Sequence, residues 1–546
     1  MMCAMGFWTS LIRGLGGAND REAAYHAEAD AVRAASRSDR LDPRFRQDMR
    51  QLATREGVVR IGAAVHDDQV PVILPRADVL GSGHALVLGG TGAGKTRVVG
   101  AVMKALLQTI AREPSSLGLW VVDHKSEMAE LTVALIGELV DSLPSAQANR
   151  LLDQLVIVNP FSTTALVPFQ ILQAESGVAP EDVAFEVTTL VNRLGGAELG
   201  VKQDDLVYHL LLLGVLKQLS LPDVAHLLAD PATLASAAAE SPSEQVRAFF
   251  GGGTRLPAAS LDGVRARLNR LLRLPSTRLM LGSSGAPSFH AMLGSKIVIV
   301  DVGSPPLGCE DLGRFWAGMF TLKVTRGVFQ RRPAEARRPV AIFVDEWQEG
   351  LAAGGDVADH YERVLSMARS RGVSLWLVSQ TLAGATRVSP SLPKVVATNT
   401  QLQLLFRSSS ADAHAMSEML PVTGRRPRPA SAPWEAAPKS PFLSPREELD
   451  ALVTEVTRLP NRVFYLWNRL RPYPAVLARA IDVDPQVAPM RPAETTRRLR
   501  DGALAIPIHE LERRVRAGAA ARPPQAGAED GATEFTVAPR RPRRRR

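Results

Sequence analysis

Seven short apolar runs alternate with amphipathic helical segments along the chain, and they limit the possible folds more than any other feature. Within each run the apolar residues are continuous rather than alternating, which is typical of strands covered by helices on both faces. The sequence therefore predicts an α/β fold with a mostly parallel central sheet. The predicted strands are residues 84–88, 119–122, 155–158, 296–300, 340–344, 373–378 and 402–406.

The arrangement of these runs divides the 546 residues, which are too many for one ordinary core, into several parts. Residues 180–281 carry helical patterns only and predict an all-α insertion domain. The insertion separates the two parts of the α/β unit, residues 58–179 and 282–483. We expect a charged, helical or loose segment at 1–57 and a low-complexity basic tail at 484–546, with a helix near 509–516.

Two local patterns near residue 440 predict the structure of the chain there. Residues 421–441 are rich in proline and arginine, which is typical of a surface loop or linker. Ser444 then precedes a helical pattern, with Glu447 three residues later, and this spacing predicts a capping box.

The overall composition restricts partners and location. The formal net charge of +9 is compatible with a polyanionic partner such as nucleic acid, because lysine and arginine displace counterions from phosphates. A disordered basic tail explains the charge equally well, since six of the last seven residues are arginine. Two cysteines, Cys3 and Cys309, exclude a disulfide framework. No run approaches the ~18 apolar residues of a membrane span, so we expect a cytoplasmic protein.

A glycine-rich segment, GGTGAGKT, lies between the first predicted strand and a helical pattern, and it fits the phosphate-binding loop G-x-x-x-x-G-K-[ST]. In such a loop the backbone N–H groups surround phosphates, Lys95 reaches the β- and γ-phosphates, and Thr96 ligates Mg²⁺. The sequence therefore predicts a site for ATP and Mg²⁺. The expected nucleotide-binding residues are Gly89, Gly90, Thr91, Gly92, Ala93, Gly94, Lys95 and Thr96.

Two later strand ends carry the residues that hydrolysis would require. In PVAIFVDEWQE, Asp345 and Glu346 follow a buried strand, so Asp345 is expected to hold Mg²⁺ and Glu346 to polarise water. In MARSRGVSLWLVSQ, Gln380 ends the next strand and is suited to sense the γ-phosphate. Arg369 and Arg371 precede that strand, and either could reach the nucleotide of a neighbouring subunit or be a surface charge.

A further charged cluster, VVDHKSEM, follows the predicted strand at 119–122. Asp123 could ligate a metal, but Asp345 already supplies that carboxylate, and Lys125 and Glu127 do not suit a plain metal site. We expect Lys125 and Glu127 to form a polar contact that connects this loop to the nucleotide or to the next subunit.

The order of these motifs resembles that of the coupling-protein ATPases of type IV secretion and conjugation, within the FtsK- and HerA-like translocases. The series runs from GHALVLGGTGAGKT through VVDHKSEM, LVIVNPF and an all-helical insertion to KIVIVDV, VAIFVDEWQEGL and ARSRGVSLWLVSQT. VVDHKSEM resembles the family motif Asp-Pro-Lys-Gly-Glu, with Asp123, Lys125 and Glu127 in register. The resemblance covers about residues 83–477 and makes Arg369 the preferred arginine finger.

This resemblance implies a RecA-like P-loop NTPase domain that bears the helical domain and assembles as a homo-hexameric ring around DNA. The implied partners are DNA, a relaxase or other protein substrate, and a membrane or secretion-channel component. Family members usually begin with transmembrane helices, which this sequence lacks, so peripheral attachment at the inner face of the cytoplasmic membrane stays open. Two alternatives are a nucleotide-controlled receptor for protein cargo and a HerA-like DNA motor in genome handling or phage defence.

Overall fold

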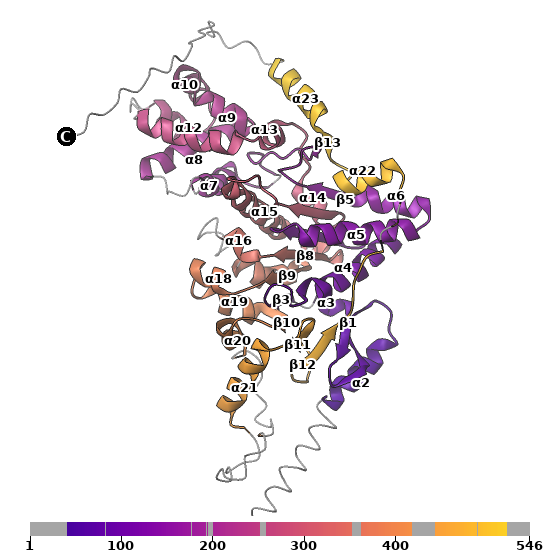
Figure 1. Ribbon diagram of the computed structural model, residues 1–546. Helices are drawn as coiled ribbons and strands as arrows, with labels where there is room; N and C mark the ends of the chain where they lie inside the picture. The colour runs from indigo at the N-terminus through magenta and orange to yellow at the C-terminus, as the bar shows by residue number, and fades with distance from the viewer. Residues whose placement is uncertain are drawn as a thin grey trace, which may run out of the picture.

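The computed structural model describes residues 41–520 except 82, 176, 193, 195–199, 252–257, 352–361, 418–427, 429–442, 487 and 489. Its centre is an eleven-stranded sheet in the order β2-β1-β12-β11-β10-β3-β9-β8-β4-β7-β5, which extends from β1 and β12 in the lower part of Figure 1 to β5 in the upper part. All seven predicted strands are present in it. They are β3 (His84–Leu88), β4 (Gly118–Asp123), β5 (Leu155–Val158), β7 (Ile297–Asp301), β8 (Val340–Asp345), β9 (Val373–Ser379) and β10 (Thr400–Phe406).

These seven strands are mutually parallel and occupy adjacent places in the sheet. Their carboxyl ends therefore meet at one edge, where open α/β sheets bind their ligands. β3 lies between β10 and β9, so one strand separates it from β8. This order places the segments after Leu88, Asp123, Asp345 and Ser379 along the same edge.

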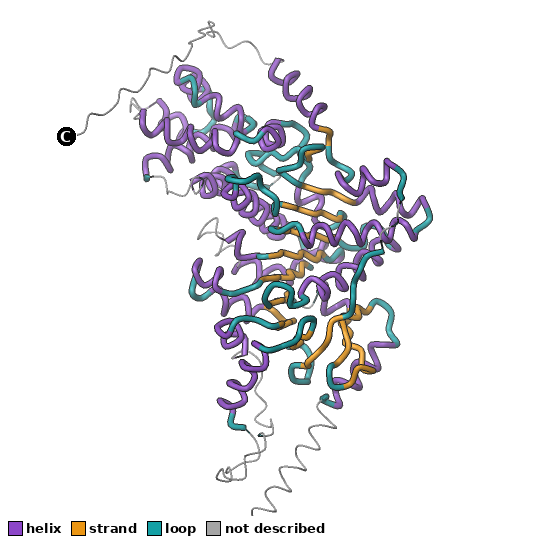
Figure 2. Tube along the Cα trace, viewed as in Figure 1, coloured by secondary structure: helices purple, strands orange, loops and turns teal. Residues whose placement is uncertain are grey.

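Both faces of the parallel strands are covered, as the continuous apolar runs predicted. On β4, Trp120 and Val122 belong to one hydrophobic cluster, whereas Leu119 and Val121 belong to the other. The period of two in a strand sends neighbouring side chains to opposite faces, so a strand buried on both sides is apolar throughout. The helices lie on both sides of the strands in Figure 2. One face carries α4 (Lys95–Arg112), α5 (Glu127–Ser142) and α6 (Ser145–Gln154), and the other carries α15 (Glu310–Gln330), α16 (Trp347–Leu351), α18 (Ala383–Val388) and α19 (Leu392–Asn399).

Four antiparallel strands extend the sheet beyond β10. They are β11 (Val463–Asn468), β12 (Val476–Ala480), β1 (Val58–Ala64) and β2 (Asp67–Pro75). α2 (Pro43–Ala53) packs on this end through Phe45, whose ring lies edge-on to Tyr473 with centroids 5.1 Å apart. α3 (Arg76–Leu80) follows β2.

The interval predicted to be helical contains helices throughout its described residues. They are α7 (Pro180–Asn192), α8 (Val201–Leu216), α9 (Leu221–Leu227), α10 (Pro231–Ala239), α11 (Glu244–Gly251), α12 (Ala258–Leu272) and α13 (Pro275–Gly282), and they lie together at one end of the molecule in Figure 1. Most of their buried apolar side chains belong to the same hydrophobic cluster as those of α15, whereas Leu279 packs with Leu166 and Leu511. α14 (Phe289–Leu293) then leads back to β7.

The remaining elements lie in different parts of the molecule, and α23 (Ile508–Ala520) contacts α13 of the helical interval. α20 (Ser410–Ser417) and α21 (Pro445–Thr457) pack together, and Ser444 and Glu447 form the predicted capping box. β6 (Ala165–Leu166) pairs with β13 (Ile506–Pro507), α23 includes the helix predicted near 509–516, and two 3₁₀ turns span Pro333–Arg337 and Ala368–Arg371. Most of the proline- and arginine-rich stretch 421–441, residues 1–40 and residues 521–546 lie outside the described part.

The stretch 484–546, predicted as a low-complexity tail with a helix near 509–516, contains a further packed helix. α22 (Ala493–Asp501) contacts α5 and β5, with Leu499 buried. Just before α22, Arg491 forms an ion pair with Asp141 of α5, with 2.6 Å between Nη2 and Oδ2. The polar sequence of this segment carried little periodic apolar signal, so a contact across more than 300 residues determines its place. Among the described helices, none has the length and apolar content to span a bilayer.

Candidate nucleotide site

The glycine-rich segment forms a loop between β3 and α4, which begins at Lys95. Gly92 and Gly94 have φ values of 71° and 109°, in the left-handed region that favours glycine. A Cβ on Gly94 would lie 2.8 Å from Arg462 Cα, whereas one on Gly92 would meet no atom within 4 Å. The loop is thus closely packed on one side and open on the other, as a backbone cradle for phosphates requires.

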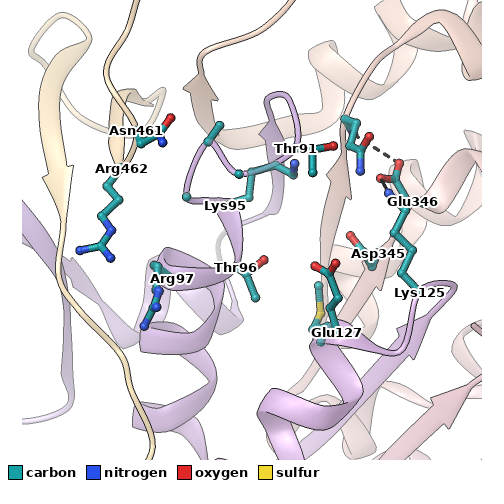
Figure 3. Close-up of a pocket in the computed structure, with 15 residues that line it drawn as sticks. Thr91, Lys95, Thr96, Arg97, Lys125, Glu127, Asp345, Glu346, Asn461 and Arg462 are labelled. Atoms are coloured by element: carbon teal, nitrogen blue, oxygen red, sulfur yellow. Dashed lines mark hydrogen bonds and ion pairs between the residues drawn. The ribbon is translucent and has the colours of Figure 1, made fainter.

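The open side of the loop faces a cavity of about 340 Å³ (Figure 3). The predicted nucleotide-binding and catalytic residues meet here, apart from Gly89, Gly90 and Arg369. The lining comprises Thr91, Gly92, Ala93, Gly94, Lys95, Thr96, Arg97, Lys125, Glu127, Met128, Asp345, Glu346, Gln380, Asn461 and Arg462. Segments far apart in sequence therefore form one site.

Lys95 occupies the centre of this cavity. Its ammonium group donates hydrogen bonds to the carbonyl oxygens of Gly89, at 2.5 Å, and Gly90, at 3.1 Å. Burial lowers the pKa of Lys95, although the nearby carboxylates of Glu346 and Asp345 act in the opposite direction. A charged ammonium held by two loop carbonyls can move to phosphate oxygens without further desolvation.

Asp345 and Glu346 lie together at the end of β8 but differ in their surroundings. Burial, together with the charges of Asp123 and Glu346, raises the pKa of Asp345 to about 7. Burial also acts to raise the pKa of Glu346, but hydrogen bonds from Lys125 and Gln348 outweigh it and the pKa is lowered. Glu346 therefore stays ionised, as a group that polarises water must be.

Three donors fix the carboxylate of Glu346. Lys125 Nζ lies 2.5 Å from Oε1, Gln348 Nε2 lies 2.5 Å from Oε2, and the backbone N–H of Gln380 lies 3.3 Å from Oε2. Glu346 has a φ of 43°, which is unusual for a residue other than glycine. Such backbone strain is often found at functional sites.

Thr96 and Asp345 supply oxygen atoms on facing sides of the cavity (Figure 3). Oxygen is the ligand that Mg²⁺ prefers, and Mg²⁺ usually combines one or two protein ligands with water and substrate phosphates. Within the described residues, no group of three or more His, Cys, Asp or Glu side chains could hold a metal. The oxygen atoms of Thr96 and Asp345 thus fit a Mg²⁺ ion whose other ligands are water and phosphate oxygens.

The VVDHKSEM segment has a different arrangement from the one expected. Lys125 pairs with Glu346, not with Glu127 as predicted, because Ser126, with a φ of 68°, turns the backbone between them. Glu127 starts α5 and lines the cavity. Asp123 is fully buried and accepts hydrogen bonds from the N–H groups of Lys125 and Ala129, each at 2.8 Å. Asp123 therefore stabilises the turn between β4 and α5 and does not line the cavity.

Arg369 is far from the cavity of its own chain. It precedes β9, and the seven residues of that strand span roughly 23 Å, so Arg369 lies at the opposite edge of the sheet from Gln380. Its side chain is exposed and makes no hydrogen bond or ion pair with the described residues. Arg371, in contrast, donates to the carbonyl oxygen of Arg331. Of the two arginines, Arg369 is the one available to a neighbouring subunit.

Asn461, Arg462 and Arg97 form the side of the cavity opposite the carboxylates (Figure 3), and the sequence analysis missed them. The N–H of Arg462 donates to the carbonyl oxygen of Ala93 at 2.7 Å, so the turn before β11 is bonded to the phosphate loop. Arg462 Nη1 also lies 2.6 Å from Asp482 Oδ1. Arg97 comes two residues after Lys95 in the first turn of α4, whereas only the pairing of β11 with β10 brings Asn461 and Arg462 to the site, and no local pattern marks these two.

A second cavity of about 380 Å³ adjoins the first and shares Lys125, Glu346 and Gln380 with it. His124 also lines it, and burial lowers the pKa of His124 to about 4, so its ring is neutral. The Lys125–Glu346 pair therefore forms part of the wall between two cavities.

Comparison with known proteins gives matches only among solved structures. No protein-family model matches the chain, and no curated protein matches its sequence. The plasmid coupling protein TrwB in complex with ADP and Mg²⁺ matches with a TM-score of 0.50 and 15% identity, over 81% of this chain and 93% of that chain. VirB4 of Thermoanaerobacter pseudethanolicus matches with a TM-score of 0.46 and 12% identity, over 79% and 98%.

The phosphate loop, the parallel sheet and the strand-end carboxylates define the class as a P-loop NTPase fold of the RecA-like type. More particularly, the chain has the fold of the conjugative coupling protein TrwB. The sequence-based resemblance to the coupling proteins is thus confirmed at the level of the fold.

Proposed function

We propose that this protein is an ATP-hydrolysing DNA translocase of the coupling-protein type, which recruits DNA or a nucleoprotein and drives its transfer. The observation that carries the proposal is the cavity where the phosphate loop faces Asp345, Glu346 and Gln380, within the fold of TrwB. A site that only binds a nucleotide would need no more than the phosphate loop. Ionised Glu346 beside it adds a group suited to activate water.

The residues divide the work of hydrolysis among them. The loop N–H groups and Lys95 bind the phosphates. Thr96 and Asp345 would hold Mg²⁺, which would supply positive charge beside the phosphoryl group. Glu346 orients and polarises the attacking water, which can reach it from the second cavity. Lys125 and Gln348 keep Glu346 ionised and fixed, and Gln380 contacts the γ-phosphate side of the cavity.

An assembled ring supplies the last group. The side chain of Arg369 is exposed, lies at the opposite edge of the sheet and makes no hydrogen bond or ion pair with the described residues. In a homo-hexamer it would reach the nucleotide of the next subunit and stabilise transition-state charge, which is worth a large factor in related enzymes. The site would then depend on assembly, which couples hydrolysis to a ring around DNA.

The proposal is tested by ATP turnover of the full chain with and without DNA. We expect DNA to raise turnover, and Lys95→Ala or Glu346→Gln to abolish it. A protein that hydrolyses ATP without response to DNA, and whose residues 180–281 bind a protein partner, would instead be a nucleotide-controlled cargo receptor. Identification of a relaxase or a secretion-channel component as a bound partner would separate a coupling protein from a HerA-like motor.

A further inference from the structure

A third cavity lies away from the nucleotide site, where the chain enters and leaves the helical interval. Its volume is about 290 Å³. One wall comes from residues 169–175, which lead to α7, and another from residues 286–289, which return from α13. Lys323, on α15, also lines it. Both chain connections between the sheet and the helical interval therefore border this cavity.

Lys323 is the unusual residue of this cavity. Only 6% of the residue is exposed, yet its ammonium group has no hydrogen bond or ion pair with any described residue. The stem of Lys323 is buried while its ammonium group borders the cavity, so a bound anion would take the place of water at this group. Burial accordingly lowers the pKa of Lys323.

The nearby carboxylates are engaged elsewhere. Glu186 pairs with Arg326 on α15, one turn beyond Lys323. Glu175 accepts a hydrogen bond from the N–H of Phe289 at 2.9 Å and from Ser288 Oγ at 3.3 Å, and so caps α14. Among the residues that line this cavity, Lys323 is thus the cationic donor.

We propose that this cavity binds a small organic carboxylate, whose oxygen accepts from Lys323 Nζ and whose apolar part lies against Phe169 and Phe289. Both phenylalanines line the cavity, are at most 4% exposed and belong to a cluster of aromatic rings with Trp316 and Phe320. They offer a rigid apolar surface of the kind common in small-molecule sites.

The charges around the cavity favour a monoanion over phosphate. Phosphate sites usually combine several donors, such as arginine forks or a long helix N-terminus. Here one ammonium faces the ligand, and Glu175 lines the same cavity with a negative charge. A carboxylate with a compact apolar body matches both the charge and the volume. Bound there, it would contact both connections to the helical interval.

Binding is tested on the full chain with sodium benzoate as the probe, by thermal unfolding and by calorimetric titration. Sodium chloride at equal ionic strength and inorganic phosphate serve as comparisons. We expect benzoate to raise Tm above both salts, and Lys323→Met to remove that rise and weaken binding at least about tenfold. Lys217→Met, which removes a surface lysine paired with Glu240, is the matched control and should bind as the unchanged protein does.

A second variant keeps the test decisive if Lys323→Met does not fold. Gln173 lies exposed at the cavity, so Gln173→Glu places a negative charge beside the entrance without disturbing the core. We expect it to weaken benzoate binding through like-charge repulsion. The proposal is overturned if benzoate acts no differently from chloride, if phosphate acts equally, or if both variants bind benzoate normally. These readouts do not involve ATP turnover, so they are independent of the proposed function.

Discussion

Substitution of Lys125 by methionine should slow ATP hydrolysis without affecting the fold. Lys125 Nζ lies 2.5 Å from Glu346 Oε1, and the Glu346 side chain is only 5% exposed. Methionine keeps the length and apolar stem of lysine but removes the charge. Glu346 would then keep only the donors from Gln348 and Gln380, so its pKa would rise.

The size of the effect follows from the geometry of this pair. A hydrogen bond to a charged group contributes roughly 1.5–3 kcal/mol when buried. Lys125 is 36% exposed, so water screens part of the interaction, and the Lys125–Glu346 hydrogen bond contributes about 1–2 kcal/mol. If that energy keeps Glu346 ionised and oriented, kcat falls about tenfold. The acid limb of the pH–rate profile moves to higher pH, because the charge of Lys125 also lowers the pKa of Asp345, which is about 7, and its removal raises the pKa of both carboxyl groups.

The assay is steady-state ATP hydrolysis across pH 5.5 to 9 for the unchanged protein, Lys125→Met and Lys104→Met. Lys104 is the matched control, since it pairs with Glu138 at 2.8 Å with 32% exposure, on α4 and α5 outside the cavity. Lys104→Met should leave the profile unchanged. Wild-type turnover and an unshifted profile in Lys125→Met would refute the role assigned to the pair.

Three further predictions test other parts of the site and fold. Arg369→Ala and Lys95→Ala should each be inactive alone. A mixture of the two variants should regain ATP turnover, because some subunit interfaces then combine an intact phosphate loop with an intact Arg369. A mixture that stays inactive would contradict the action of Arg369 on the neighbouring subunit. Gly94→Ala should abolish nucleotide binding in an equilibrium titration, since its φ is 109° and the added Cβ would lie 2.8 Å from Arg462 Cα; normal binding would show that the loop does not need this close packing. Burial lowers the pKa of His84 from 6.5 to about 4, so below pH 6.5 the unfolded chain binds a proton that the folded chain does not. This residue alone should lower the free energy of unfolding by up to about 3 kcal/mol as the pH drops from 6.5 to 4. Denaturant unfolding at several pH values should show a weaker dependence of that free energy on pH for His84→Asn. An equal dependence in both proteins would count against the buried neutral ring.

The parallel sheet and the phosphate loop could be predicted from sequence because both depend on local patterns. Burial on two faces gives continuous apolar runs, and the loop needs glycines at fixed spacing before Lys95. Asp345 and Glu346 could be placed at a strand end for the same reason, since Asp345 is the last residue of the buried strand β8 and Glu346 directly follows it. Parallel strands bring such ends to one edge without any knowledge of the strand order.

The parts that sequence could not supply depend on contacts between distant segments. Arg462 reaches the loop only because β11 pairs with β10, and its neighbours in sequence give no sign of that. The partner of Lys125 was predicted wrongly. The prediction paired it with Glu127, two residues later, whereas the turn at Ser126 directs Lys125 toward Glu346 at the end of another strand. α22 was missed because its sequence is polar, and its position depends on packing against α5.

The central claim is that the cavity at the carboxyl edge of the sheet drives a DNA-dependent motor. Its most direct test is ATP turnover of the full chain with single-stranded DNA, with double-stranded DNA and with no DNA, measured together with particle mass. We expect DNA to raise ATP turnover and the active particle to have the mass of a hexamer. A monomer whose turnover does not respond to DNA would contradict it.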